Sequence, residues 1–472
     1  MSNIRISTDN CTSSRHRISR IDTTSDCLSS RGGLVLFARY LEGIALLPHL
    51  ERLFGSIRKN GKGLSVQSLF TQIFCFMVDG TSRHLTYFDE LRQDTGYAAV
   101  IETPASKMAS SHQIKRFLAG FSFVRIWPFR QVLQQLFLWR LRLEQPEVVI
   151  LGMDTMVLDN SEADVRHGVE PTYKMGVKGF QPLQITWGRF IVDAVFRGGS
   201  KHSNDGDTAI KALEHVIKFI RTRYRNVPIV VRMDAGFFDQ KIMTVLEALE
   251  VGYLIGGKLY KSIREEVDAA PAECWKRFSP ADDGDTWLFQ ALLDKRKSWS
   301  TSRYAIFMRR TNEDGQGILD FARRESIIYT NIAPDTAPGK ALMAAGHEDM
   351  LGSRALIGLY HDRGHDELVH RALKDFCSEE LPCKRFEANA ALYFMRLIAF
   401  FLMETFKEDV CPGVIELRSY ATRLRRRVID VAAKIVRTGG RTIMKVTEAA
   451  FRALKLDVLW ERAGEPPRIV WG

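Results

Sequence analysis

A mixed α/β fold, with helical regions at both ends of the chain and a β-rich insertion, is predicted by three features. Two short apolar runs, VVILGMD (148–154) and VPIVVRMD (227–234), are typical of central strands buried on both faces. Segments with helical periodicity lie around and between such runs. Residues 258–326 instead alternate apolar and polar side chains, as half-buried strands do.

The first part of the chain is predicted to be mainly helical. Residues 34–54 and 64–80 carry apolar side chains at spacings of three and four. SSHQIKRFLAGFS (110–122) begins with two serines that can cap a helix and carries Lys115 and Arg116. This segment is either a surface helix or a helix presented to DNA.

The predicted core follows in the order strand, strand, strand, helix, strand, helix, strand. Segments 177–187 and 189–199 flank Gly188 and are typical of a hairpin. A helix is expected over 208–224, and a second, capped by Asp239, precedes the strand YLIGGKL (253–259). IIYTNI (327–332) is expected either to return to the sheet or to close the insertion. This order indicates one mixed sheet covered by helices.

We divide the chain into six segments. They are a polar, basic arm (1–33), a helical DNA-binding or assembly region (34–146), a first core part (147–257), a β-rich insertion (258–326), a second core part (327–410) and a basic C-terminal region (411–472).

Composition narrows the class of protein. The chain has 472 residues, enough for two or three domains, and its hydrophobic (45%) and charged (26%) fractions exclude disordered, collagen-like and disulfide-scaffold classes. Its net charge of +11 favours a polyanionic partner such as nucleic acid. Seven scattered cysteines without a CxxC pair favour a reducing cytosol. We expect no secretory signal and no membrane span, and interpret 392–403 as a buried core helix.

Two aspartates mark the ends of the two apolar strands. Asp154 ends the first and Asp234 the second. A carboxylate at such a position is costly to bury unless it is paired or bound to a metal. The pair therefore suggests a shared cation, although acids also commonly end strands and begin turns.

A third acid lies in the segment LYHDRGHDELVHRALKDF (359–376). In a continuous helix, Tyr360, Arg363, Glu367 and Lys374 would share a stripe about 60° wide, opposite an apolar face. Gly364 is unfavourable inside a helix, so the alternative is a helix that begins there, with Tyr360 and Arg363 in the preceding turn. The stripe could also be a solvated face with ordinary ion pairs.

Together the three acids suggest metal chemistry on phosphates. Two divalent ions held by carboxylates can clamp the attacking and leaving oxygens of a phosphodiester displacement. Mg²⁺ prefers such oxygen ligands. Arg363 and Lys374 would then hold phosphates of the substrate strand.

These residues resemble a known family. The spacing Tyr360-x2-Arg363-x3-Glu367-x6-Lys374 is similar to the signature of DDE transposases from bacterial insertion sequences. The other similar stretches are MDTMVLD around Asp154, RMDAGFF around Asp234, YKMGVKGFQPLQITW (173–187) and LPCKRFEANAALYF (381–394). The resemblance covers about residues 145–440. The chain departs from the family in having Ala235-Gly236 rather than Ser-Gly, and in its three histidines near Glu367.

The resemblance implies an RNase H-like catalytic core interrupted by a β-rich insertion. By motif, Asp154, Asp234 and Glu367 are the catalytic and metal-binding acids, holding two Mg²⁺ ions for which Mn²⁺ can substitute. Tyr360, Arg363 and Lys374 would contact terminal phosphates. The partners implied are transposon-end inverted repeats and target DNA, bound by a homodimer in the bacterial cytoplasm at the nucleoid.

The C-terminal region carries a second set of basic residues. Acids are sparse there, which favours contact with the DNA backbone over a solvated face. The strongest candidates are Arg423, Arg426 and Arg427.

Several weaker candidates have simpler interpretations. They are His361, His365 and His370 as surface or phosphate neighbours, Cys377 and Cys383 as packing residues, Glu387 as a rival third acid, and Asp159 and Asp239 as turn or cap residues. Two alternative functions stay open. One is an RNase H-like nuclease that does not join strands, and the other is an inactive, transposase-derived DNA-binding protein.

Overall fold

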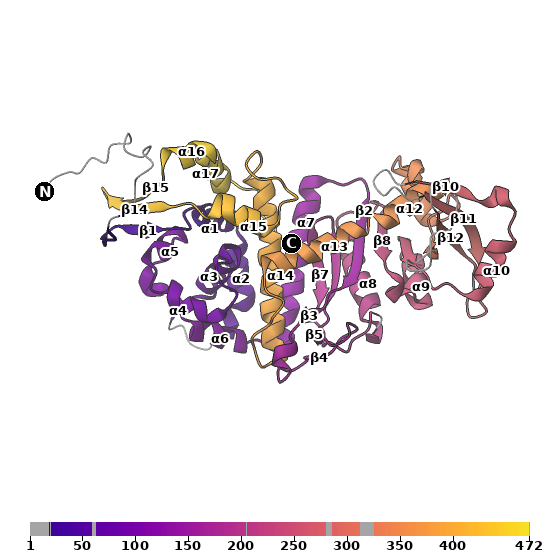
Figure 1. The fold of residues 1–472 in the computed structure, drawn as a ribbon, viewed down its shortest axis with the longest axis horizontal. Helices are drawn as coiled ribbons and strands as arrows, with labels where there is room; N and C mark the ends of the chain where they lie inside the picture. The colour runs from indigo at the N-terminus through magenta and orange to yellow at the C-terminus, as the bar shows by residue number, and fades with distance from the viewer. Residues whose placement is uncertain are drawn as a thin grey trace.

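The computed structural model describes residues 18, 20–58, 63–203, 205–279, 286–311 and 325–471. Figure 1 shows an elongated molecule with the N-terminal helices at one end and the strands after β9 at the other. The helix α14 (Phe386–Asp409) occupies the middle, beside the central strands of a long sheet. Most of the predicted arm, residues 1–17 and 19, lies outside the described residues.

The N-terminal region is helical, as predicted. Ser65 caps α3 by accepting a hydrogen bond from Ser68 N, and Ser110 forms a capping box with Gln113 at the start of α6. The serine cap expected at position 110 is therefore confirmed. The helices are α1 (Leu34–Gly43), α2 (Leu46–Phe54), α3 (Val66–Asp79), α4 (Phe88–Leu91), α5 (Thr95–Val100), α6 (Ser111–Ala119) and α7 (Phe123–Glu144).

A nine-stranded mixed sheet forms the core. Its order is β10-β11-β12-β13-β9-β8-β2-β6-β7, in which β2, β8 and β9 are parallel and the other neighbours are antiparallel. The core strands are β2 (Val149–Thr155), β6 (Leu183–Trp187), β7 (Phe190–Val195), β8 (Ile229–Met233), β9 (Gly252–Gly256) and β13 (Glu325–Thr330). This mixed α/β core is consistent with the RNase H-like fold that the resemblance implies.

The insertion lengthens the same sheet instead of forming a separate one. Strands β10 (Lys276–Phe278), β11 (Thr286–Asp294) and β12 (Arg303–Thr311) join it through β13, and the helix α10 (Lys261–Ala269) precedes them. Because β13 pairs with β9 on one side and β12 on the other, it both returns to the core and closes the insertion.

Helices pack around the sheet, and α14 is central among them. α14 is long and apolar enough to cross a membrane, the one such helix in the described residues, but it is mostly buried. It is therefore the core helix expected for this segment (Figure 1). The helices are α8 (Thr208–Arg221), α9 (Gln240–Ala248), α11 (Ala337–Ala344), α12 (Ser353–His361), α13 (Gly364–Phe376) and α14 (Phe386–Asp409).

Small sheets complete the fold, and one of them joins the two ends of the chain. The C-terminal helices α15 (Ala421–Leu424), α16 (Glu448–Ala453) and α17 (Leu456–Gly464) accompany a hairpin, β14 (Ala433–Thr438) and β15 (Arg441–Lys445), that was not predicted. Part of the predicted loose arm is also a strand, β1 (Cys27–Ser29), which pairs with β14. Strand pairing over so long a sequence separation leaves no local signal. The third sheet contains β3 (Leu158–Asp159), β4 (Glu170–Pro171) and β5 (Lys178–Phe180).

Candidate active site

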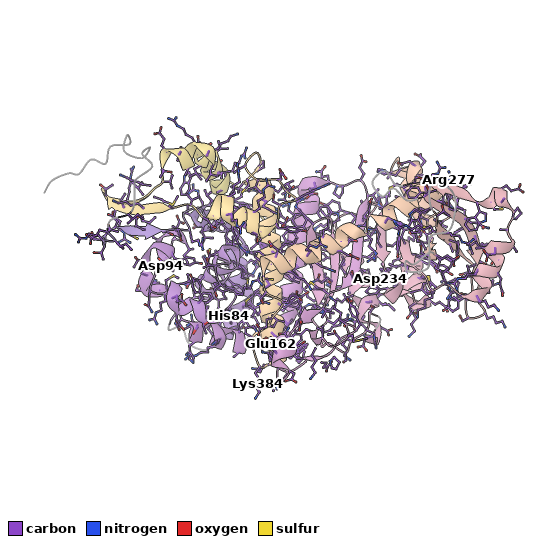
Figure 2. All side chains as sticks on the ribbon, in the orientation of Figure 1. His84, Asp94, Glu162, Asp234, Arg277 and Lys384 are labelled. Atoms are coloured by element: carbon purple, nitrogen blue, oxygen red, sulfur yellow. The ribbon has the colours of Figure 1, made fainter. Side chains whose placement is uncertain are left out.

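The two predicted aspartates lie beside each other at one edge of the sheet. Strands β2 and β8 are parallel neighbours with Met153 opposite Met233. Each methionine is followed by an aspartate, so Asp154 and Asp234 occupy the same level at the carboxyl ends of adjacent strands. Figure 2 labels Asp234. Backbone pairing alone is enough to place the two carboxylates together.

Local hydrogen bonds orient both carboxylates. Asp234 caps the short 3₁₀ turn Ala235–Phe237 and accepts a hydrogen bond of 2.9 Å from Gly236 N. Asp154 Oδ1 accepts one of 2.7 Å from Thr155 N. One oxygen of each side chain is thus held by backbone, which leaves the other for a cation or substrate.

The site disfavours negative charge on Asp154. Burial raises the pKa of Asp154 to about 6, and the neighbouring charge of Asp234 adds to the shift. The charge of Glu367 acts in the same direction. A bound cation would relieve this repulsion, and hard carboxylate oxygens are the ligands that Mg²⁺ prefers.

Arg363 lies between the first aspartate and the third acid. Its Nη1 is 3.8 Å from Asp154 Oδ2, and its Nη2 is 3.9 Å from Glu367 Oε1. Of the two arrangements expected for this segment, the structure has the one in which a helix begins at Gly364, although Tyr360 lies in the preceding helix α12, which ends at His361, and not in a turn. Arg363 is the residue before α13, so the break allows it to turn toward the acids.

Tyr360 also reaches this edge of the sheet, from the end of α12. A Cβ added to Gly256 at the end of β9 would lie 2.5 Å from the Tyr360 hydroxyl and 2.9 Å from Ala235 N. The hydroxyl therefore packs against Gly256, which also lies beside the backbone of Ala235. Only glycine at position 256 leaves room for this contact.

Lys374 is placed differently from the other residues of the motif. Its Nζ donates to Glu379 Oε2 at 2.9 Å, near the far end of α13. It does not pair with the three acids, although its charge contributes to lowering the pKa of His370. The structure thus brings Tyr360, Arg363 and Glu367 to the two aspartates and leaves Lys374 farther along the helix.

Sequence reasoning missed a buried ion pair directly beneath the site. Arg232 Nη2 lies 3.1 Å from each carboxylate oxygen of Asp366, and Thr186 Oγ1 donates to Asp366 at 3.3 Å. A Cβ on Gly152 would lie 2.4 Å from Asp366 Oδ2, so this glycine admits the carboxylate to the sheet. An arginine inside the apolar run VPIVVRMD was the available signal, because a buried guanidinium needs an acidic partner.

This ion pair connects the strand that carries Asp234 to the helix that carries Glu367. Arg232 lies two residues before Asp234, and Asp366 lies one residue before Glu367. A second guanidinium hydrogen bond, from Arg232 Nη1 to Leu359 O at 3.1 Å, fixes the end of α12. The pair therefore positions the glutamate helix against the strands that carry the aspartates.

Two further residues adjoin the acids. His370 Nδ1 is 4.0 Å from Asp154 Oδ2, and burial, with the charges of Lys374 and Arg363, lowers the pKa of His370 to about 4. His370 is therefore neutral at pH 7. Tyr173 is exposed, and burial of part of its ring together with the charges of the three acids raises the pKa of its phenol.

The other candidates lie outside this cluster. Glu387 pairs with Arg385 at 3.5 Å in the first turn of α14. Asp159 accepts hydrogen bonds from Ser161, and Asp239 caps α9, as expected of turn and cap residues. The ring of His361 packs near Trp287, and the side chain of His365 lies outside the described residues.

The C-terminal arginines are exposed. Arg423 pairs with Glu416 at 3.6 Å, and Arg426 and Arg427 lie on the π turn Arg425–Ile429. Arg425, which lies between Arg423 and Arg426 in the sequence, instead donates hydrogen bonds to backbone carbonyls.

The donor set suits a hard divalent cation. In the described ranges, no group of three His, Cys, Asp or Glu side chains lies close enough together to hold a metal ion. The side chain of Glu367 is 67% exposed, so it can rotate toward the aspartates without disturbing the core. Asp154 and Asp234 would provide the fixed ligands and Glu367 an adjustable one.

Comparison with known families gives a match that spans most of the chain. The family model described as transposase DDE domain group 1 matches residues 12–461, nearly the whole chain. A search of curated proteins finds no match.

Proposed function

The chain belongs to the family of the transposase DDE domain, group 1, and we propose that it cleaves DNA at transposon ends and joins the freed 3′-hydroxyl to target DNA. We further propose that it originates from a bacterial insertion sequence and acts as a homodimer on paired ends in the cytoplasm, at the nucleoid. The observation that carries the proposal is the grouping of Asp154, Asp234 and Glu367 around Arg363.

Two successive displacements at phosphorus account for this activity. In the first, a water oxygen forms a bond to the scissile phosphorus, the bond to the 3′-oxygen breaks, and the 3′-hydroxyl is released. In the second, that hydroxyl loses its proton and attacks a phosphodiester of the target, whose own 3′-oxygen leaves. Both steps place additional negative charge on the phosphate oxygens.

The residues of the site have distinct parts in these steps. Asp154, Asp234 and Glu367 would hold two Mg²⁺ ions, or Mn²⁺ in their place, which lower the pKa of bound water and stabilise the attacking and leaving oxygens. Arg363 would exchange its carboxylate partners for a phosphate, to which its planar fork is matched. The Tyr360 hydroxyl would donate a hydrogen bond to the same strand.

Groups outside the acid cluster would bind the DNA. Lys374 would approach a phosphate as a point charge once Glu379 is displaced. Arg423, Arg426 and Arg427 are exposed and would contact the backbone of the duplex. Such contacts position DNA without reading its sequence.

The test separates binding from chemistry. We expect Asp154→Ala to bind DNA from the ends flanking its own coding sequence as the wild type does, and to lose Mg²⁺-dependent cleavage, because a metal-binding carboxylate is absent. Asp349→Ala, at an exposed aspartate of the 3₁₀ turn Glu348–Leu351, is the matched control and should cleave normally.

Retained cleavage by Asp154→Ala would remove the assignment. A second assay supplies donor DNA with a free 3′-hydroxyl and measures joined products. Cleavage without joining by the wild type would indicate a nuclease, and DNA binding with neither activity would indicate an inactive DNA-binding protein.

A further inference from the structure

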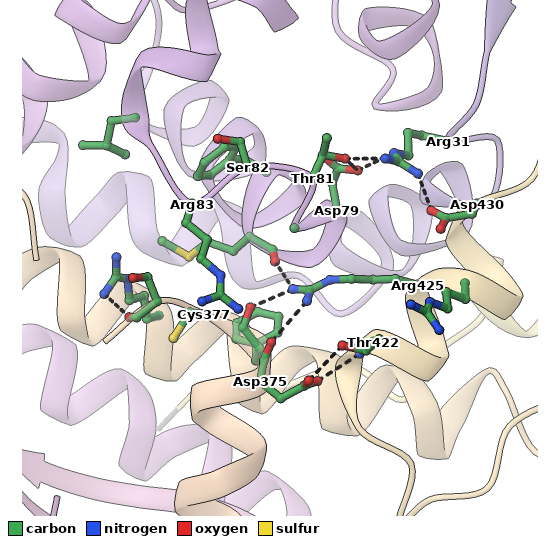
Figure 3. Close-up of a pocket in the computed structure, with 18 of the residues that line it drawn as sticks. Arg31, Asp79, Thr81, Ser82, Arg83, Asp375, Cys377, Thr422, Arg425 and Asp430 are labelled. Carbon is green, nitrogen blue, oxygen red and sulfur yellow. Dashed lines mark hydrogen bonds and ion pairs between the residues drawn. The ribbon is translucent and has the colours of Figure 1, made fainter. Parts of the chain in front are cut away.

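A pocket of about 260 Å³ lies where the two ends of the chain meet the glutamate helix. Its walls are the end of α3 with the following loop, the end of α13, part of α14, and α15 with the adjoining π turn (Figure 3). Segments far apart in the sequence thus enclose one space. Its lining among the described residues does not include the three catalytic candidates.

The charge of this pocket is positive. Five arginines line it against three aspartates, an excess of two positive charges. Two of the aspartates, Asp79 and Asp430, are already engaged by Arg31. The third, Asp375, accepts hydrogen bonds from the backbone N and hydroxyl of Thr422, at 3.0 and 2.8 Å.

Two of the remaining guanidiniums are held by neutral partners. Arg425 donates to backbone carbonyls at the ends of α3 and α13, including Met77 O at 2.9 Å and Phe376 O at 2.7 Å. Arg396 donates to two others, Ser378 O at 2.7 Å and Glu380 O at 3.0 Å. Carbonyl groups satisfy the N–H donors but carry no formal negative charge to balance the guanidiniums.

Gly80 permits this arrangement. It ends α3 with a φ of 63°, and a Cβ there would lie 2.2 Å from the Arg425 guanidinium. Burial lowers the pKa of Arg425 and Arg396, and the charge of Arg83 acts in the same direction. The charges of Asp375 and Asp79 oppose the shift at Arg425, and that of Glu380 opposes it at Arg396. The fold therefore concentrates like charges that an anion would stabilise.

The last two guanidiniums are exposed. Arg83 follows α3 and Arg426 lies on the π turn. Within the described part of the chain, neither side chain has a hydrogen bond or an ion pair. Figure 3 shows Arg83 and Arg425 reaching into the pocket from different sides. An oxyanion entering it would meet unengaged, fork-shaped donors, which suit phosphate oxygens.

The pocket is also connected to the catalytic candidates. Glu367 lies in the first turn of α13 and Asp375 in the last, a rise of about 12 Å along one helix. This distance corresponds to three or four base pairs at about 3.4 Å each. One duplex could therefore place a phosphate at the acids and another at the pocket.

We propose that this pocket binds a phosphate of the DNA backbone through Arg83 and Arg426. The inference rests on the proposed function and adds an anchoring point for the DNA on which the enzyme acts. It differs from a general basic surface because its two exposed arginines come from the N-terminal and C-terminal regions of the chain and line the same pocket.

The salt dependence of DNA binding tests the proposal. The full chain carrying Arg83→Gln and Arg426→Gln is titrated with a labelled mixed-sequence duplex over a series of KCl concentrations. Loss of one phosphate contact should reduce the slope of log affinity against log salt by about 0.9. Because both side chains are exposed, the melting temperature should match that of the wild type.

The matched control replaces two exposed arginines elsewhere, Arg223→Gln and Arg277→Gln, and should leave the slope unchanged. An unchanged slope in the Arg83/Arg426 variant would overturn the proposal. Inorganic pyrophosphate provides the second arm. Pyrophosphate could raise the melting temperature of the wild type but not of the Arg83/Arg426 variant, while the two proteins show the same salt slope for DNA binding. In that case the pocket binds a free phosphate and the DNA assignment is wrong.

The two proposals fail in different ways. If the wild type does not cleave DNA, the proposed function is contradicted. The salt slope is measured on DNA binding, so this result would not change it. Normal cleavage at low salt with an unchanged slope in the arginine variant would contradict only the pocket.

Discussion

At the scale of single residues, Asp154 has an environment that opposes its own ionisation. Burial raises its pKa from 3.8 to about 6, and Asp234 adds repulsion. Between these pH values the folded protein holds a proton that the unfolded chain has released. Folding is therefore penalised progressively as pH rises from about 4 to about 6, unless a cation neutralises the site.

Asp154→Asn should remove this penalty. In EDTA we expect the variant to gain stability relative to the wild type as pH rises from 4 to 7, by up to roughly 3 kcal/mol. Denaturant unfolding at several pH values measures the difference, with Asp349→Asn as the control. Adding Mg²⁺ at pH 7 should reduce the difference in stability between Asp154→Asn and the wild type, because it should stabilise the wild type alone. A difference between the variants that does not change with pH would contradict this account of Asp154.

At the scale of elements, the position of α13 depends on the Arg232–Asp366 ion pair. The pair is buried, with side-chain exposures of 9% and 4%, and burial raises the pKa of Asp366 while Arg232 opposes that shift. Removing one partner would leave an uncompensated charge against β2 and β8. Replacing both with apolar side chains would restore packing without the charge.

Asp366→Ala should lower the free energy of unfolding by about 3–5 kcal/mol. The double variant Arg232→Met, Asp366→Leu should recover most of this stability but not cleavage, because the ion pair would no longer hold α13, which carries Glu367, in position. Unfolding by urea and the Mg²⁺ concentration needed for half-maximal cleavage are the two readouts. Wild-type Mg²⁺ dependence in the double variant would show that the pair only stabilises the fold.

At the scale of the whole molecule, the two ends of the chain are joined. Strand β1 pairs with β14, Ile469 N donates to Ile44 O at 3.2 Å, and the Trp471 ring stacks on His49 at 3.7 Å. The N-terminal helices therefore depend on the C-terminal region for part of their packing. The phosphate pocket lies at the same junction.

Truncation should reveal this dependence in a graded way. Ending the chain after Gly464 removes only the tail contacts, whereas ending it after Asp430 also removes β14, β15, α16 and α17. We expect a small decrease in melting temperature for the first and a larger one for the second, with proteolytic cleavage appearing near α1 and α2. Equal melting temperatures for the two truncated chains would contradict the interlocking of the termini.

Much of the core and of the site followed from local patterns. Apolar runs predicted β2 and β8, and parallel pairing then required Asp154 and Asp234 to be neighbours. Helical periodicity and serine caps predicted the N-terminal helices. The hairpin β14–β15 was missed because its basic, half-exposed residues have no strong period.

The sequence by itself determined the order of core elements, the acids at the strand ends and the excess of positive charge, because these depend on residue type and short-range spacing. Only the tertiary structure decided which of the two helical arrangements around Gly364 forms, that Lys374 pairs with Glu379, that Arg232 binds Asp366 and that Arg83 and Arg426 line one pocket. Those features join residues that are distant in sequence or reoriented by a turn. Their energies arise from burial and charge, which exist only once the chain has folded.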